Sequence, residues 1–458
     1  MFEPLALSEL ATYLSAELHG EDVQFDRVET DTRRPMPGAL FIALRGERFD
    51  GHHYLAQAAQ AGAVAALVDQ VDESISLPQI KVNDTRLALG LLGGLNRSRF
   101  DGPLIAITGS SGKTSVKEMI ASILRAAKGK DDAVLATQGN LNNDLGVPLT
   151  LLRLNAEHQA AVIELGASRA GEIAYTVSLA KPHVSVLNNA GTAHVGEFGS
   201  PEKIVQAKGE IIDGLADDGT AILNRDDAAY SKWARRTGSR RILSFGMENP
   251  LADFYPGSIA YDLRGCPSFM VFGPECSLRV QLNLLGRHNI ANALAAVAAT
   301  WAIGVDEDSI AEGLRALQPV KGRLVAQVAP NGVRVIDDTY NANPASMKAA
   351  IDVLTGFTGR RVLVLGDMGE LGEWAQSAHS DIGEYARDKV DVLLATGPLM
   401  QHAVDAFGAG GHHLADQAGL IELLRQEAGN GTTILVKGSR SAAMENIVAA
   451  LCPTSENH

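Results

Sequence analysis

The chain has 458 residues, of which 46% are hydrophobic and 21% are charged, and its formal net charge is −14. A chain of this length exceeds a single hydrophobic core, so the composition predicts a soluble globular protein of about two to four domains. The acidic balance argues against a nucleic-acid groove. The three cysteines form no close pair, which excludes a zinc motif and a disulfide framework.

No targeting or membrane signal stands out along the chain. Residues 1–4 lack the basic start and the apolar core of a signal peptide. The most apolar long segment, 290–305, is too short and too mild to cross a bilayer and is expected to be a buried helix. We therefore expect a cytoplasmic location, no membrane insertion and no nucleic-acid partner.

Three α/β modules follow one another, and they set the expected domains at 1–82, 83–316 and 317–458. The first is a small α/β domain whose expected strand, helix and strand lie at 39–44, 54–61 and 63–68. A connecting helix over 85–97 then leads into the second module.

The second module opens with a phosphate-binding loop. A strand is expected at 103–107 and a helix is expected to follow the loop, an arrangement that directs backbone N–H groups and the helix dipole at phosphate oxygens. Lys113 would reach the β- and γ-phosphates, and the Thr114 hydroxyl would bind Mg²⁺. Ile107 stands where the usual motif has glycine, so this is a shortened variant. The expected nucleotide-binding residues are Gly109, Ser110, Ser111, Gly112, Lys113, Thr114 and Ser115.

The rest of the second module predicts a parallel sheet. Three continuous apolar runs are typical of parallel strands that are covered on both faces, at 160–164, 184–187 and 220–223. Residues 250–285 break this rhythm with shorter alternating runs, which indicates a small antiparallel excursion. The module is therefore expected to be a central P-loop ATPase domain.

The third module has a Rossmann-like rhythm of strands and helices. Its expected strands lie at 333–336, 361–365, 390–394 and 433–436. No G-x-G-x-x-G follows the first strand, so the pattern does not predict a dinucleotide.

Several polar residues follow the strands of the second module, where open α/β sheets bind ligands. Glu164 ends a strand and is the expected second Mg²⁺ ligand, although an exposed acid at a strand end would look the same. His194 could bind a second metal ion, and an ordinary solvated or core histidine is the alternative. Lys208 lies on a helical pattern and, judged alone, reads as a surface lysine.

Asparagines form two further groups. Asn140, Asn142 and Asn143 offer amide donors to a charged substrate, or they make a plain turn. Asn289 and Asn292 share one face of a helix, where they suit an adenine edge or a helix cap.

Polar clusters also follow two expected strands of the third module. After the first strand come Asp338, Tyr340, Asn341 and Asn343, and after the last come Lys437, Ser439 and Arg440. The two cations of the latter group suit a substrate carboxylate, which arginine can bind with two hydrogen bonds.

Together these motifs resemble the Mur ligase family, the ATP-dependent amide-forming enzymes of peptidoglycan synthesis. The match covers nearly the whole chain. It rests on the Thr-Gly-x-x-Gly-Lys-Thr loop at 108–114, on 140–143, on 164–167, on the His194 loop, on Lys208, on Asn289 and on 338–341. Residues 338–344, 366–372 and 437–440 resemble most the members that act on D-alanyl-D-alanine.

The resemblance implies a role for each matching residue. It implies Lys113 on phosphate, Thr114 and Glu164 on one Mg²⁺, and His194 with a carbamylated Lys208 on a second. For the nucleotide it implies Asn289 and Arg323, with Asp338 near the ribose; Asn292 and Tyr340 complete the expected ATP-binding set. Segments 31–33 and 41–52 match the family's UDP-sugar region and carry Thr32, Arg33 and Asp50.

The implied reaction passes the γ-phosphate of ATP to the carboxylate of a UDP-N-acetylmuramoyl-tripeptide. The amine of D-alanyl-D-alanine then attacks the acyl phosphate, with Lys113, Lys208, His194 and Asn143 as the expected catalytic residues. A monomer is expected. Two alternatives stay open: another amino-acid-adding ligase, such as a folylpolyglutamate synthetase relative, and a P-loop switch or motor ATPase.

Overall fold

The computed structural model describes residues 4–46, 49–191, 198, 200–369 and 371–453. Contacts between residues divide the chain into two compact units. The first comprises Met1–Tyr255, Val271–Leu278 and Ala291–Leu314, and the second comprises Pro256–Met270, Arg279–Ile290 and Arg315–His458. The domain boundaries expected after residues 82 and 316 remain predictions.

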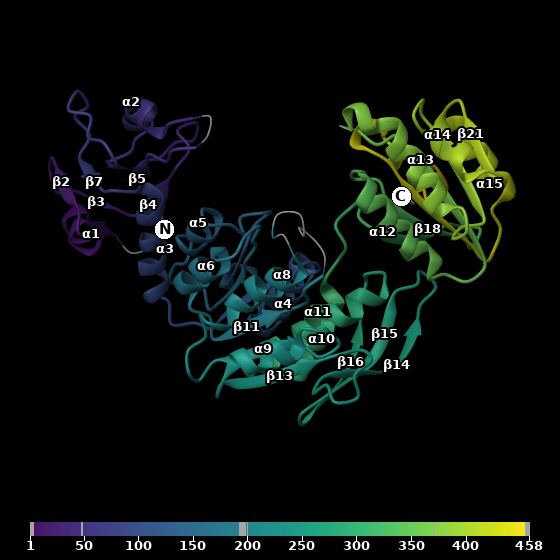
Figure 1. Cartoon of the computed structure of the whole chain (residues 1–458), viewed down its shortest axis with the longest axis horizontal. Coiled ribbons are helices and arrows are strands. Elements are labelled where there is room, and N and C mark those ends of the chain that lie inside the picture. Colours follow the sequence, from purple (N-terminus) through teal and green to yellow (C-terminus); the bar gives the residue numbers. More distant parts are fainter. Residues whose placement is uncertain (1–3, 47–48, 192–197, 199, 370, 454–458) are drawn as a thin grey trace, which may run out of the picture. The chain divides into compact units, whose positions relative to one another are not determined.

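Five strands form the N-terminal sheet of the first unit (Figure 1). In sheet order they are β2 (Glu17–His19), β7 (Gln79–Lys81), β6 (Ala65–Val68), β5 (Ala39–Ile42) and β4 (Arg27–Glu29). The strands from β4 to β7 are parallel, and β2 is antiparallel to β7. A separate antiparallel pair joins β1 (Leu5–Ala6) and β3 (Gln24–Phe25). The predictions at 39–44 and 63–68 are confirmed by β5 and β6.

Helices cover both faces of this sheet. Apolar residues of α1 (Leu7–Leu14) and α3 (Thr85–Ser98) pack on one face, and those of α2 (Leu55–Gln60) pack on the other. The expected helix at 54–61 is confirmed, and a short 3₁₀ turn, η1 (Gly51–Tyr54), precedes it. The Asp84 carboxylate accepts hydrogen bonds from the Arg86 and Leu87 N–H groups and so begins α3 where the sequence predicted.

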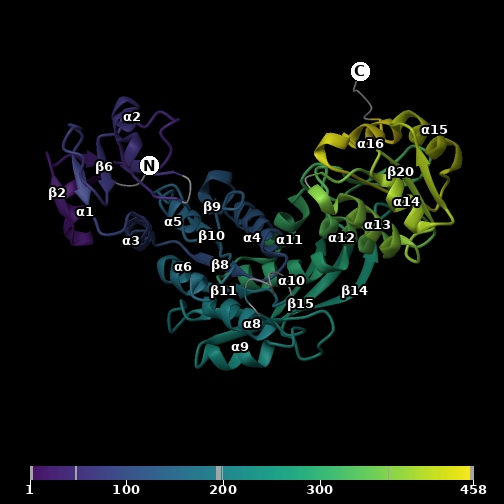
Figure 2. The same ribbon diagram turned by 45° about the horizontal axis from the view of Figure 1, so that its top comes forward.

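The central sheet has six parallel strands, as Figures 1 and 2 show in part. In sheet order they are β13 (Arg241–Phe245), β12 (Thr220–Asn224), β11 (Val184–Leu187), β8 (Leu104–Thr108), β10 (Ala160–Glu164) and β9 (Val134–Ala136). The helices of this region are α4 (Lys113–Lys128), α5 (Gly146–Leu151), α6 (Glu172–Ala180), α8 (Pro201–Gly209), α9 (Tyr230–Thr237), α10 (Arg287–Trp301) and α11 (Glu307–Ala316), with 3₁₀ turns η2 (Asp131–Ala133) and η3 (Glu210–Ile212). The predicted parallel sheet is confirmed.

The strand order reverses beside β8. The chain runs from β8 to β9 and β10 on one side and then crosses to β11 on the other. The carboxyl ends of β8 and β11 therefore border the point where open α/β sheets bind ligands.

A three-stranded sheet occupies the region where the sequence predicted a small excursion. Its order is β14 (Tyr255–Tyr261), β15 (Pro267–Gly273) and β16 (Cys276–Gln281), and its residues are divided between the two units.

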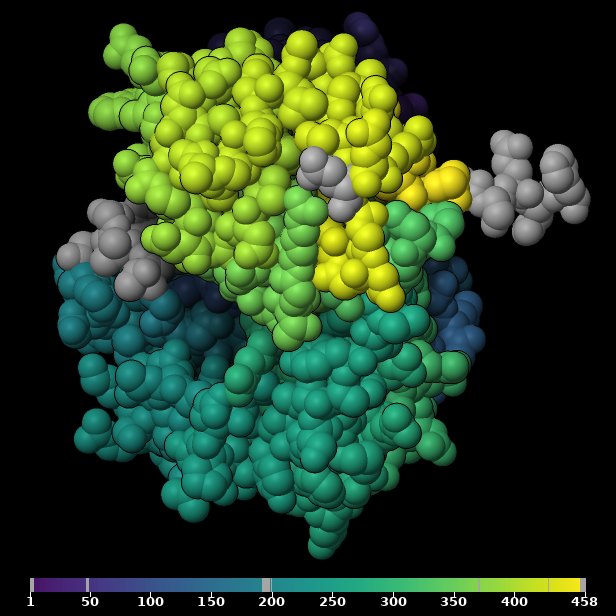
Figure 3. Space-filling model, turned by 90° about the vertical axis from the view of Figure 1, so that its right-hand side faces the viewer, coloured from purple at the N-terminus to yellow at the C-terminus, as the bar shows by residue number. Residues whose placement is uncertain are grey.

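The second unit contains a six-stranded sheet. Figure 3 shows the outer surface of the C-terminal residues in light green to yellow. Its order is β17 (Val325–Val328), β18 (Arg334–Asp338), β22 (Thr432–Lys437), β19 (Arg360–Gly366), β20 (Val392–Thr396) and β21 (Gly411–Leu414). Only β17 is antiparallel to its neighbour among these strands. The Rossmann-like prediction is confirmed.

Helices sandwich this sheet as well. Apolar residues of α12 (Pro344–Thr355), α13 (Ala375–Ala386) and α14 (Met400–Phe407) pack on one face. Those of α15 (Gln417–Glu427) and α16 (Glu445–Leu451) pack on the other. Short 3₁₀ turns, η4 (Gly372–Trp374) and η5 (Arg440–Ala442), lie near the strand ends. Among the described residues, no helix combines the length and the apolar character that a membrane crossing requires.

Candidate active site

The phosphate-binding loop connects β8 to α4, and Gly112 is its most constrained residue. Its φ of +77° lies in the left-handed region that favours glycine. A Cβ at this position would lie 2.5 Å from Asn188 Nδ2 and 2.6 Å from Asn292 Oδ1. These two amides are hydrogen-bonded to each other at 3.1 Å, so they cannot both retreat without losing that bond. Any side chain at residue 112 would therefore force either the loop or these amides to shift.

Asn189 holds the loop from the neighbouring strand end. Its Oδ1 accepts from Ser111 N at 2.9 Å, its Nδ2 donates to Ser111 O at 3.1 Å, and its carbonyl accepts from Ser110 N at 3.0 Å. Asn188 Nδ2 also donates to Ser111 O, at 3.0 Å. Neither asparagine was among the predicted site residues. Their position at the end of the apolar run 184–187 was the signal that could have found them.

Lys113 begins α4 and folds back over the loop. Its Nζ donates to Gly109 O at 2.9 Å. Burial lowers the pKa of Lys113, and the Glu164 carboxylate opposes that shift. An ammonium in this position can move from a backbone carbonyl to a phosphate oxygen without leaving the loop.

Glu164 is a buried carboxylate, 2% exposed, at the end of β10. Its Oε2 accepts from Thr114 Oγ1 at 3.0 Å and its Oε1 accepts from Asn142 Nδ2 at 2.8 Å. The structure thus brings together the two residues predicted to bind one Mg²⁺. Oxygen donors of this kind fit Mg²⁺, which binds one or two protein carboxylates together with substrate phosphates.

Lys208 lies near the end of α8 and is 2% exposed, so the surface alternative is wrong. Its Nζ is 3.4 Å from Ala167 O and 5.5 Å from the centre of the Phe198 ring. Burial and, second to it, the nearby Lys113 ammonium lower the pKa of Lys208 to about 8. A part of the lysine population is therefore neutral and nucleophilic near neutral pH.

Two carboxylates of this region, those of Glu210 and Glu164, bind other groups. The Glu210 carboxylate accepts from Gly171 N at 2.8 Å and Ala174 N at 3.0 Å, which fixes the start of α6. The Glu164 carboxylate accepts hydrogen bonds from Thr114 and Asn142. Across the described ranges, no ion pair involves Lys208, and no three His, Cys, Asp or Glu side chains group as metal ligands. His194, the other predicted metal ligand, lies outside the described residues.

The predicted asparagines have different surroundings. Asn142 reaches Glu164, whereas Asn143 Oδ1 accepts from Gly146 N at 2.8 Å and begins α5. Asn140 is exposed.

On α10, Asn292 contacts Asn188, and Asn289 Nδ2 donates to Leu285 O at 2.8 Å. The side chain of Ser115 is half-buried in the first turn of α4.

In the second unit, Asp338 and Lys437 form a buried pair. Lys437 Nζ lies 2.7 Å from Asp338 Oδ2 and donates to Asn341 O at 2.9 Å. Burial raises the pKa of Asp338, and the Lys437 ammonium opposes that rise. Lys437 thus holds the loop after β18. Its predicted contact with a substrate carboxylate would require a rearrangement of this pair.

The other predicted residues near β18 shape the same loop. Arg323 stacks on the Tyr340 ring at 4.7 Å, and Tyr340 N donates to Gly322 O at 2.9 Å. Asn343 caps α12 by accepting from Ser346 N at 2.8 Å. Asn341 Oδ1 accepts from the next backbone N–H.

Ser439 and Arg440 follow β22. Ser439 Oγ lies 3.1 Å from Ser441 Oγ. The side chain of Arg440 is 72% exposed and contacts Glu445 Oε1 at 3.2 Å. An exposed cation with a single weak partner is able to bind an incoming anion.

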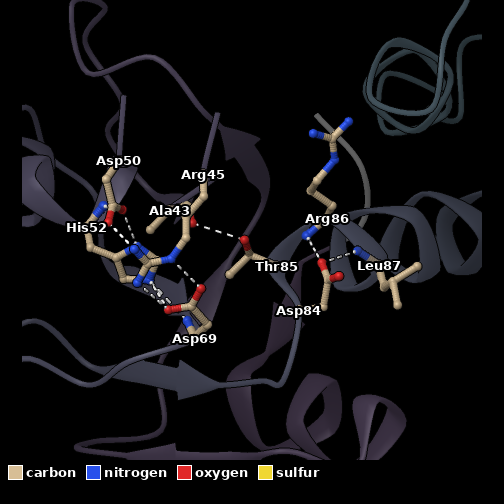
Figure 4. A network of polar contacts seen from close by, with 9 residues as sticks. All are labelled: Ala43, Arg45, Asp50, His52, Asp69, Asp84, Thr85, Arg86 and Leu87. Carbon is tan, nitrogen blue, oxygen red and sulfur yellow. Dashed lines mark hydrogen bonds and ion pairs between the residues drawn. The ribbon is translucent and has the colours of Figure 1, made fainter. Parts of the chain in front are cut away.

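In the N-terminal sheet, the predicted Asp50 belongs to a polar network (Figure 4). The Arg45 guanidinium lies between Asp50 and Asp69 and pairs with both, at 2.7 Å for Asp69. His52 Nδ1 is 2.6 Å from Asp50, and His52 Nε2 accepts from Asp69 N at 3.1 Å. This network fixes the loop that follows β5.

The other two predicted residues of this region lie outside that network. Arg33 binds Asp31 through two hydrogen bonds, which lowers the pKa of Asp31 to about 2, and Thr32 is half-buried.

The central parallel sheet and the phosphate-binding loop between β8 and α4 define a P-loop nucleotide-binding protein, and three models of one ligase family match successive parts of the chain. The Mur ligase family catalytic domain matches 24–94, the Mur ligase middle domain matches 107–300, and the Mur ligase glutamate ligase domain matches 322–440. The chain belongs to the Mur ligase family.

Relatives within the family are similar over their full length. The UDP-N-acetylmuramoyl-tripeptide–D-alanyl-D-alanine ligase of Escherichia coli (strain K12) is 46% identical, with 98% of each chain covered. The enzyme of that name from Bacillus subtilis (strain 168) is 36% identical, with 97% of each covered. A crystal structure of MurF from Acinetobacter baumannii has a TM-score of 0.82 at 39% identity, covering 98% of this chain and 99% of that one. MurF from Thermotoga maritima in complex with ADP has a TM-score of 0.73 at 28% identity, covering 93% and 96%.

Proposed function

We propose that this chain uses ATP to join D-alanyl-D-alanine to a UDP-N-acetylmuramoyl-tripeptide in the cytoplasm, as a monomer. The observation that carries the proposal is the group formed by Lys113, Thr114 and the buried Glu164 at one sheet edge. This group suits a nucleoside triphosphate. The names of the full-length relatives given above identify the two substrates that we propose.

The reaction proceeds in two balanced steps. A carboxylate oxygen of the tripeptide attacks the γ-phosphorus, the bond to the β-phosphate oxygen breaks, and ADP leaves with that electron pair. The dipeptide amine then attacks the acyl carbon of the acyl phosphate. The resulting tetrahedral intermediate expels inorganic phosphate, and the amine loses its proton to leave an amide.

The residues of the chain act mainly by position and charge. Lys113 stabilises the negative charge on the transferred phosphoryl group. Asn188 and Asn189 hydrogen-bond to the loop and hold its conformation before ATP binds. Mg²⁺, when held by Thr114 and Glu164, would neutralise phosphate charge. His194 and a carbamylated Lys208 would hold a second ion.

The carbamate follows from the environment of Lys208. A neutral amine attacks CO₂ and releases one proton, and its pKa near 8 makes the neutral form accessible. The product is an anionic oxygen ligand, which Mg²⁺ accepts, whereas an ammonium repels the ion.

A phosphate-release assay tests the whole proposal. Purified protein receives ATP and Mg²⁺, and the tripeptide and D-alanyl-D-alanine are each omitted in turn. We expect sustained phosphate release only when both are present. Equal release without them would favour a switch or motor ATPase. Release with glutamate in place of the dipeptide would favour a folylpolyglutamate-type ligase.

A further inference from the structure

Lys117 is a buried lysine for which the proposed reaction gives no role. It lies on α4, one helical turn beyond Lys113, and is 2% exposed. Its Nζ donates to Thr137 O at 2.7 Å and pairs with Glu118 at 2.9 Å. Burying a lysine amine removes it from water, which costs free energy unless hydrogen bonds and ion pairs offset the loss. We therefore asked what these two contacts do for the site.

Thr137 follows β9, the edge strand of the central sheet, and continues the pairing with β10. Its N–H donates to Val162 O at 3.1 Å. Its Oγ1 accepts from Glu164 N at 2.9 Å. The hydroxyl thereby replaces a backbone carbonyl in the ladder and binds the residue that carries the metal-side carboxylate.

The segment that starts at Thr137 returns to Glu164 a second time. Asn142 Nδ2 donates to Glu164 Oε1 at 2.8 Å, and Asn142 O accepts from Gly166 N at 2.8 Å. Glu164 is therefore held at its backbone by one end of this segment and at its carboxylate by the other. Lys117 fixes the first end to the helix that carries the phosphate-binding loop.

We propose that Lys117 is a positioning residue, which sets the place of the Glu164 carboxylate relative to Thr114 by holding Thr137 against α4. The inference rests on the proposed role of Glu164 and Thr114 in binding Mg²⁺ with the nucleotide. Lys117 touches neither reactant. Its effect reaches the site through two contacts, from Lys117 to Thr137 and from Thr137 to Glu164.

A purely structural lysine would lower stability without affecting metal binding in particular. The test therefore compares the Kd for ADP with and without Mg²⁺ by isothermal titration calorimetry. We expect Lys117→Met to weaken Mg²⁺-ADP about tenfold, close to 1.4 kcal/mol, and to leave the affinity for ADP in EDTA unchanged. Glu118→Gln is the matched control, because it removes the ion pair and keeps the contact with Thr137.

A second pair of variants keeps the test decisive if Lys117→Met folds poorly. Thr137→Val keeps the shape and removes the acceptor for Glu164 N, whereas Thr137→Ser keeps a hydroxyl. We expect the valine variant to lose Mg²⁺-ADP affinity and the serine variant to retain it. In the double variant Lys117→Met/Thr137→Val, the losses should be less than additive, because both changes act on one connection.

The outcomes separate this inference from the proposed function. If wild-type protein binds ADP equally with and without Mg²⁺, the proposed metal role fails. If the wild type depends on Mg²⁺ and both Lys117→Met and Thr137→Val bind Mg²⁺-ADP normally, Lys117 is not a positioning residue. Equal weakening with and without Mg²⁺ would also overturn the inference, since it would report damage to the loop as a whole.

Discussion

Lys113 and Lys208 repel each other across the candidate active site. The Lys113 ammonium adds to the effect of burial and lowers the pKa of Lys208 to about 8. The sheet edge thus holds one cation for phosphate and one amine that readily loses its proton. An anion, or loss of the Lys208 proton, would relieve this repulsion.

The first prediction is that Lys208 forms a carbamate whose amount rises with pH through about 8. Protein equilibrated with ¹³C-bicarbonate should show a carbamate resonance in its ¹³C NMR spectrum. Lys208→Arg should lack this resonance, and Lys208→Ala should be nearly inactive and regain part of its activity with acetate. A Lys208→Ala variant that keeps most of its activity would contradict the prediction.

The same shift determines a dependence of stability on pH. Between about pH 8 and 10.5, the unfolded chain binds a proton at Lys208 that the folded chain does not bind. The contribution of Lys208 to the free energy of unfolding therefore rises with pH in that window. The difference in unfolding free energy between wild type and Lys208→Met, from urea titrations, should follow this rise.

The second prediction concerns the packing of the phosphate-binding loop. Gly112→Ala should abolish ADP binding in calorimetry, because the new Cβ meets the Asn188 and Asn292 amides. Gly129→Ala is a matched control: Gly129 has a φ of +63°, and a Cβ there meets no atom within 4 Å. Both variants carry similar backbone strain, of about 1 kcal/mol. Equal ADP binding by the two variants would show that the Asn188 and Asn292 side chains move to accommodate the new Cβ.

Much of the fold was predictable where strands are covered on both faces. Continuous apolar runs predicted β10 and β11 over their full lengths, because burial on both sides removes the need for polar residues. β21 was missed, since its Gly-His-His-Leu sequence is a short edge strand that is only partly buried. β9, the strand that leads to Thr137, was missed because it has only 3 residues.

The candidate site was predictable only where the chemistry is local in sequence. The phosphate-binding loop is one motif, so its residues could be named directly. The roles of Asn188 and Asn189 depend on β11 lying beside β8, which no local pattern contains. For Asn143 a catalytic role was predicted, and its side-chain Oδ1 accepts from Gly146 N at the start of α5. A turn-forming asparagine and a substrate-binding one look alike in sequence.

The third prediction concerns the buried pair in the second unit. Lys437→Met should lower the free energy of unfolding by about 3–5 kcal/mol, because it leaves the Asp338 carboxylate buried without its partner. The double variant Lys437→Met/Asp338→Asn should recover part of the loss, since no isolated charge remains. Urea unfolding monitored by circular dichroism measures both. A single variant as stable as wild type would mean that water reaches Asp338.

The last prediction concerns recognition of the incoming dipeptide. Arg440 is exposed and weakly paired with Glu445, so its guanidinium can exchange that partner for the carboxylate of D-alanyl-D-alanine. Arg440→Ala should raise the KM for the dipeptide about 30-fold, which corresponds to about 2 kcal/mol for a lost charged hydrogen bond. The KM for ATP should stay near the wild-type value. Arg425→Ala, which removes an exposed arginine that donates to Ala450 O, should change neither constant. Equal rises for ATP and dipeptide in Arg440→Ala would indicate that Arg440 supports the fold or a closed state.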